Sequence, residues 1–181
     1  MSPSAMTARA EGRGQGKELW LLCAPAAPRP VAELVRAFAA ERPATVLGPT
    51  RGAGHELARA LAAGLGLPLA ERAELDVERG QSELASGARA WPALADALAA
   101  AGARALLVAE AELLCALTAR ALDLAPERAR ALHVAPGRLV LLRDDPGGLV
   151  LRRANVLAPE ERAGGTALPG VDVSGRERGR A

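Results

Sequence analysis

Residue types that could do chemistry follow directly after three apolar runs in the middle of the chain. Cys23 ends the first run, and Glu110 lies just beyond the third. Arg51 and His55 come shortly after the second. A thiolate can act as a nucleophile, an arginine can bind anionic oxygens, and an imidazole or a carboxyl group can transfer protons. These side chains can cooperate only if the three runs end at the same place in the fold.

The elements that would position them alternate between apolar runs and amphipathic segments, which predicts an α/β fold. The expected strands are 19–23, 45–47, 105–108, 139–142 and 149–151. The expected helices are 31–41, 54–65, 91–101 and 112–122, with a short helical turn over 126–132 and an irregular segment over 71–87.

This alternation favours a mostly parallel sheet covered on both faces, a three-layer α/β/α sandwich. The run from Asp144 to Gly148 has turn composition, so the last two strands should form an antiparallel edge hairpin. Ligands in such sheets bind at the carboxyl ends of the strands, where the chemically competent residues lie.

Composition limits the classes of function. The 181 residues are 50% hydrophobic but only 2% aromatic, which leaves few side chains to stack on bases. The 23 basic residues balance 21 acidic ones, so no field of one sign attracts nucleic acid or an anionic membrane. Lys17 is the only lysine, and the abundance of Arg, Ala and Gly is typical of a GC-rich, bacterial-type gene. We therefore expect neither nucleic acid nor a membrane as partner.

The ends of the chain differ from its middle. Residues 1–17 and 158–181 are polar and glycine-rich, so we expect two disordered tails around one domain at 18–157. The first tail lacks the apolar segment of a signal peptide, and Cys23 and Cys115 sit in apolar runs, as reduced thiols of a cytoplasmic protein would. No metal site and no cofactor are expected.

Three later segments carry a family resemblance, in order along the chain. They are 105–114 (ALLVAEAELL), 122–128 (LDLAPER) and 136–155, which ends in Asn155. Together with residues from Glu18 onward, they resemble the histidine phosphatase superfamily, the phosphoglycerate mutase-like proteins. The resemblance implies the α/β/α sandwich of that family, without a cap insertion.

The family's catalytic residues are largely replaced in this sequence. In the family, the first strand ends in Arg-His-Gly, whose histidine becomes phosphorylated; here Cys23, Ala24 and Pro25 take these places. The phosphate-binding arginine after the second strand corresponds to Gly52, one position beyond Arg51.

Two further family positions complete the comparison. The second histidine corresponds to Glu110, and only Glu74 matches the proton-donating carboxylate. The resemblance therefore implies a degenerate member that lacks the catalytic histidines. We expect a binding or interaction module with a vestigial phosphate pocket at Cys23, Arg51 and Gly52, whose partner is a protein or a small anionic ligand. The oligomeric state stays open.

An active enzyme remains the alternative, a phosphatase of small phosphomonoesters with a divergent site. Cys23 and Arg29 fit the Cys-x5-Arg pattern of cysteine phosphatases. That loop binds phosphate through successive backbone N–H groups, which Pro25 and Pro28 lack. His55 and His133 lie outside the family's catalytic positions, and Glu110 could equally cap the helix that follows it.

Overall fold

The computed structural model describes residues 17–24, 30–78, 82–101, 103–129, 131–145 and 148–156. The two expected tails lie outside the described residues, apart from Lys17, and so do Pro25, Pro28 and Arg29. Within the described part, no helix is long and apolar enough to cross a membrane.

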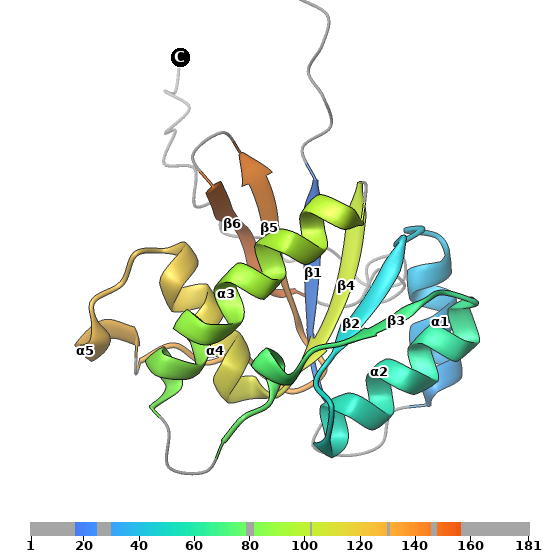
Figure 1. Cartoon of the computed structure of the whole chain (residues 1–181), viewed down its shortest axis with the longest axis horizontal. Helices are drawn as coiled ribbons and strands as arrows, with labels where there is room; N and C mark the ends of the chain where they lie inside the picture. Colours follow the sequence, from blue (N-terminus) through green and yellow to red (C-terminus); the bar gives the residue numbers. More distant parts are fainter. Residues whose placement is uncertain are drawn as a thin grey trace, which may run out of the picture.

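One six-stranded sheet forms the centre of the fold (Figure 1). Its order is β3-β2-β4-β1-β5-β6. The strands are β1 (Glu18–Cys23), β2 (Thr45–Gly48), β3 (Leu69–Glu71), β4 (Arg104–Ala109), β5 (Leu139–Asp145) and β6 (Gly148–Val156). The first four strands in the order run parallel, and β5 and β6 pair antiparallel at the edge. The expected mixed sheet with an antiparallel edge hairpin is confirmed.

Helices cover both faces of the sheet. They are α1 (Val31–Ala39), α2 (Gly52–Leu65), α3 (Glu83–Ala100), α4 (Ala111–Ala121) and the short α5 (Pro126–Ala129), with a 3-10 turn, η1 (Ala73–Leu75). Buried residues of α1 and α2 pack with Trp20 and Leu22 on one face of β1. Residues of α3 and α4 pack with Leu19 and Leu21 on the other face. The continuous apolar runs follow from this double burial.

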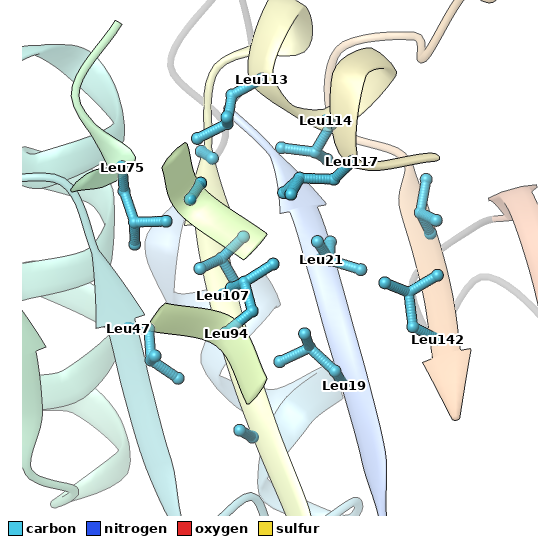
Figure 2. Close-up of a cluster of buried hydrophobic side chains, with 14 of the residues drawn as sticks. Leu19, Leu21, Leu47, Leu75, Leu94, Leu107, Leu113, Leu114, Leu117 and Leu142 are labelled. Carbon is cyan, nitrogen blue, oxygen red and sulfur yellow. The ribbon is translucent and has the colours of Figure 1, made fainter. Parts of the chain in front are cut away.

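The core between the sheet and α3–α4 consists of leucine and alanine (Figure 2). Leu21 and Leu107 point from neighbouring strands toward Leu94 of α3 and Leu117 of α4. Small residues let the two helices approach, since a β-carbon at Gly87 would lie only 2.8 Å from that of Ala116. A core with few aromatic residues is therefore filled by close approach of the backbones.

Two expectations from the sequence were wrong in detail. The strand β3 (Leu69–Glu71) was not expected, and the segment 71–87 is not irregular throughout, because it contains η1 and the first turn of α3, which begins at Glu83, well before Trp91. Ser82 caps α3 by accepting a hydrogen bond from the N–H of Ala85 at 3.3 Å. Pro92 lies inside this helix, where it removes one backbone hydrogen bond. Ala90 and Leu94 of this helix are buried in the core cluster that they share with α4, and this burial offsets that loss.

The topology brings the candidate strand ends together. Cys23 and Ala109 are partners in the register of β1 and β4, and Leu47 of β2 pairs with Leu107 of β4. The residues after these strands, from Ala24, Pro49 and Glu110 onward, therefore begin at the same edge of the sheet. This is the edge at which parallel α/β sheets bind ligands.

Candidate functional site

Cys23 is a buried core residue at the end of β1. Its side chain has no solvent exposure, and Sγ lies 3.7 Å from the carbonyl oxygen of Ala24 and 3.9 Å from that of Val134. Burial raises the pKa of the Cys23 thiol to about 11, with smaller contributions from Cys115 and the carboxylates of Glu110 and Glu112. The thiol is thus neutral and shielded near pH 7, which argues against its use as a nucleophile.

Ala24 occupies the place that follows β1. Its backbone N–H donates a hydrogen bond to the carbonyl of Ala109 at 2.9 Å, which continues the pairing of β1 with β4. Only a methyl group extends from this position, and a methyl group offers neither a lone pair nor a proton. The structure places Ala24 at the predicted strand end, and its own side chain has no atom that could attack a phosphoryl centre.

Glu110 and Gly52 come from different loops and lie against each other. A β-carbon built at Gly52 would be 3.2 Å from Oε1 of Glu110. Gly52 has a φ of 83°, a left-handed conformation that disfavours side chains. Glu110 is the N-cap residue of α4, yet its side chain accepts no capping hydrogen bond. Its carboxylate lies beside Gly52 instead.

Arg51 forms an ion pair with Asp76. Its Nε lies 3.6 Å from Oδ2 of Asp76, and its side chain is 66% exposed. The guanidinium therefore lies at the surface of the site and is partly neutralised by Asp76. The three residues of the predicted pocket therefore have different surroundings. Cys23 is buried in the core, Gly52 lies beside Glu110, and Arg51 is exposed and pairs with Asp76.

Asp76 is the residue that the sequence analysis missed. Its side chain is buried and accepts hydrogen bonds from the backbone N–H of Thr50 at 2.7 Å and from the Thr50 hydroxyl at 2.6 Å. Its own carbonyl accepts a hydrogen bond from Arg89 of α3. Asp76 thus ties the segment after η1 to the loop after β2. Its position between Leu75 and Val77 was the only sequence signal of burial.

Glu74, the match to the family acid, lies in η1 and is exposed. It lines a surface groove with five other residues: Arg72, Arg89, Pro92, Ala93 and Asp96. None of the strand-end candidates Cys23, Ala24, Gly52 and Glu110 is among the residues that line this groove. Glu74, which we expected at the acid position, therefore lies in a groove formed with α3.

The two histidines have structural contacts. Nδ1 of His55 lies 3.1 Å from the carbonyl oxygen of Pro49 and 3.7 Å from a carboxylate oxygen of Glu71. The carbonyl of His133 accepts a hydrogen bond from Asn155 at 2.7 Å, and Asn155 in turn accepts one from the N–H of Ala135 at 2.9 Å. Neither histidine supplies a base beside Ala24 through a contact seen here.

Three charged side chains were placed near the strand ends in the described part of the chain. Glu110 and Asp76 are carboxylates and Arg51 is a cation, whereas the candidate Arg29 lies outside the described residues. Over the described part of the chain, no group of three or more His, Cys, Asp or Glu side chains is placed to hold a metal ion. An anionic ligand at this edge would be repelled by the Glu110 carboxylate.

Comparison with solved structures gives the same fold at low sequence identity. A mycobacterial glucosyl-3-phosphoglycerate phosphatase is 16% identical, with a TM-score of 0.58 over 78% of this chain and 97% of its own. Bacillus stearothermophilus YhfR is 14% identical, with a TM-score of 0.64 over 75% and 95%. The α-ribazole phosphatase of Shigella flexneri is 16% identical, with a TM-score of 0.56 over 77% and 96%.

The sequence comparison identifies the family. No curated protein gives a significant match. The family model described as "Histidine phosphatase superfamily (branch 1)" matches residues 45–157, from β2 through the closing hairpin. This range includes Gly52, Glu74 and Glu110, and lies beyond Cys23 and Ala24. The chain belongs to the histidine phosphatase superfamily.

Proposed function

We propose that this member of the superfamily has lost phosphoryl transfer and acts as a binding or interaction module. The observation that carries the proposal is the position of the Glu110 carboxylate, 3.2 Å from where a β-carbon of residue 52 would lie. The resemblance implies two cationic or neutral donors at these positions, a histidine and an arginine. A carboxylate beside a glycine offers no donor to a phosphoryl oxygen and repels it.

The missing nucleophile supports the same proposal. The family route requires an imidazole nitrogen at the end of the first strand, and Ala24 has none there. The neighbouring thiol of Cys23 is fully buried, and its pKa is raised to about 11. Ala24 has no nucleophilic atom, and the burial and raised pKa of Cys23 disfavour its thiolate as a nucleophile at neutral pH.

The fold around the lost chemistry is intact. Leu21, Leu107 and Leu114 are fully or almost fully buried, and Asp76 holds the loop after β2 in place. We therefore infer a role that needs the folded domain, such as recognition of a protein or a small ligand, in a cytoplasmic setting. If catalysis survived, the phosphatases among the structural neighbours favour hydrolysis of a phosphomonoester.

Hydrolysis of an aryl phosphate tests the proposal. The full chain is assayed with p-nitrophenyl phosphate from about pH 4 to 8, beside Cys23→Ser and Glu110→Gln, with Glu56→Gln on the exposed side of α2 as the matched control. We expect no turnover above background in any of the four proteins.

Each alternative leaves a different pattern. Turnover lost in Cys23→Ser alone would overturn the proposal in favour of cysteine-based catalysis. Turnover lost in Glu110→Gln alone would assign Glu110 as an acid or base of a divergent active site. Turnover retained in all four proteins would refute inactivity and place the nucleophile elsewhere in the chain.

A further inference from the structure

The carboxylate of Asp76 holds two consecutive residues of the loop after β2. It accepts hydrogen bonds from the backbone N–H of Thr50 at 2.7 Å and from the Thr50 hydroxyl at 2.6 Å. Oδ2 of the same carboxylate lies 3.6 Å from Nε of Arg51. Thr50 and Arg51 therefore share one buried anion as their partner, directly before Gly52.

Asp76 is itself fixed in place. Its backbone carbonyl accepts a hydrogen bond from Nη2 of Arg89, and Nη1 of Arg89 pairs with Glu78 at 2.6 Å. Leu75, the residue before it, is buried in the core cluster between the sheet and α3. The acceptor is thus preorganised, and the freedom to move lies with the exposed side chain of Arg51.

Arg51 lies next to the strand-end site, by which we mean the surroundings of Ala24, Gly52 and Glu110. Its Cα is one peptide, about 3.8 Å, from that of Gly52. Oε1 of Glu110 lies 3.2 Å from the place of a β-carbon at residue 52, and the starts of α2 and α4 lie at this same end of the sheet (Figure 1). Arginine has a long side chain with many rotamers. Its guanidinium, once freed from Asp76, comes within reach of an anion beside Glu110.

We propose that Asp76 is a positioning residue that keeps Arg51 away from the strand-end site and thereby determines which ligands this site accepts. While Arg51 is paired and Glu110 carries a carboxylate, the site disfavours phosphate and other oxyanions. Release of Arg51 supplies a guanidinium, the group that recognises phosphoryl oxygens. This inference rests on the proposed loss of phosphoryl transfer, and it adds a residue outside the family positions compared above.

Competition between two anions for one arginine makes an exposed ion pair effective. Such a pair is weak by itself. A free phosphate, however, must be immobilised and must approach Glu110, whereas the Asp76 carboxylate is already in place. Loss of the charge at Asp76 should therefore act through Arg51, beyond the effect of one negative charge fewer.

Titration of the full chain with inorganic phosphate, followed by NMR, tests the proposal. Asp76→Asn removes the charge but keeps an acceptor oxygen for the N–H of Thr50. We expect it to raise the affinity for phosphate about ten-fold in the native background, and no more than about two-fold in the Arg51→Gln background. Glu56→Gln and Arg59→Gln, both exposed on α2, are the controls for charge. Equal gains in the two backgrounds, or no gain, would overturn the proposal.

A measurement that leaves Asp76 unaltered covers the case in which Asp76→Asn does not fold. The NMR signal of the Arg51 Nε–H group, assigned by its absence from Arg51→Gln, should stay in place as phosphate is added to the native protein. Arg51→Gln should also leave the affinity for phosphate unchanged within about two-fold. A phosphate-dependent shift of this signal, or binding that Arg51→Gln weakens several-fold, would overturn the proposal. Turnover of p-nitrophenyl phosphate by the native protein would instead refute the proposed function, so the two failures are distinguishable.

Discussion

The carboxylate of Glu110 lies against the backbone of Gly52, with Oε1 3.2 Å from the place that a β-carbon would take at residue 52. The two residues are 58 positions apart in the sequence and meet because β2 and β4 are neighbours in the sheet. In the residue correspondence that we propose, these are two positions at which the family resemblance implies phosphate donors. The absence of a side chain at residue 52 leaves room for the Glu110 carboxylate.

Replacement of Gly52 by alanine should destabilise the fold by about 1–2 kcal/mol, because φ at this residue is 83°. Gly66→Ala is the control, since Gly66 also has a positive φ but nothing within 4 Å of its missing β-carbon. Urea unfolding should show a larger loss at Gly52 than at Gly66, and Glu110→Ala should recover the difference. Equal losses would mean that the Glu110 contact has no energetic effect.

Neutralisation of Glu110 should improve binding of inorganic phosphate at the strand ends. Removal of one like charge is worth roughly 1 kcal/mol at a partly solvated site, or about five-fold in affinity. Titration of Glu110→Gln and of the exposed control Glu56→Gln with phosphate, followed by NMR, measures the change. An unchanged affinity in Glu110→Gln would show that phosphate does not approach this edge of the sheet.

Cys23 should resist thiol reagents in the folded protein, because it is buried and its pKa is raised to about 11. Labelling with a disulfide reagent at pH 8 should be slow in buffer and fast in denaturant. Rapid stoichiometric labelling of the native thiol, located by mass spectrometry of the peptide that contains Cys23, would contradict this burial.

The same pKa shift predicts how stability depends on alkaline pH. The folded state holds the Cys23 proton more tightly than the unfolded state, so its contribution is complete below about pH 9. That contribution is lost as the pH rises from about 9 to 11. Urea midpoints across this range should fall more steeply for the native protein than for Cys23→Ala. If the urea midpoints of the two proteins fall equally with pH, Cys23 is not the cause of the loss of stability.

Asp76→Ala should destabilise the fold by about 2–3 kcal/mol, because two hydrogen bonds from Thr50 lose their acceptor. Thr50→Val removes only the hydroxyl bond and should cost about 1 kcal/mol. Denaturant unfolding of the two single variants and the double variant measures their coupling. Strict additivity of the losses would contradict the direct interaction of Thr50 with Asp76.

Much of the architecture could be read from local pattern. Runs such as Leu19–Cys23 are buried on both faces and therefore apolar throughout, so their strand character and central place were evident. The full length of α3 was not evident from the sequence, because a proline such as Pro92 is typical of the first turn of a helix. Packing of Gly87 on Ala116 of α4 stabilises the preceding turns. That contact joins residues far apart in sequence.

The sequence by itself determined the family and the α/β order of elements, since these depend on residue type and spacing alone. The positions of the side chains are set only by the tertiary structure. In it, Glu110 lies beside Gly52, and Glu74 lines a groove with Asp96. Asp76 is buried and accepts a hydrogen bond from Thr50. Such contacts join loops and helices distant in the sequence, and their geometry is set by how helices pack across the sheet, which no local pattern encodes.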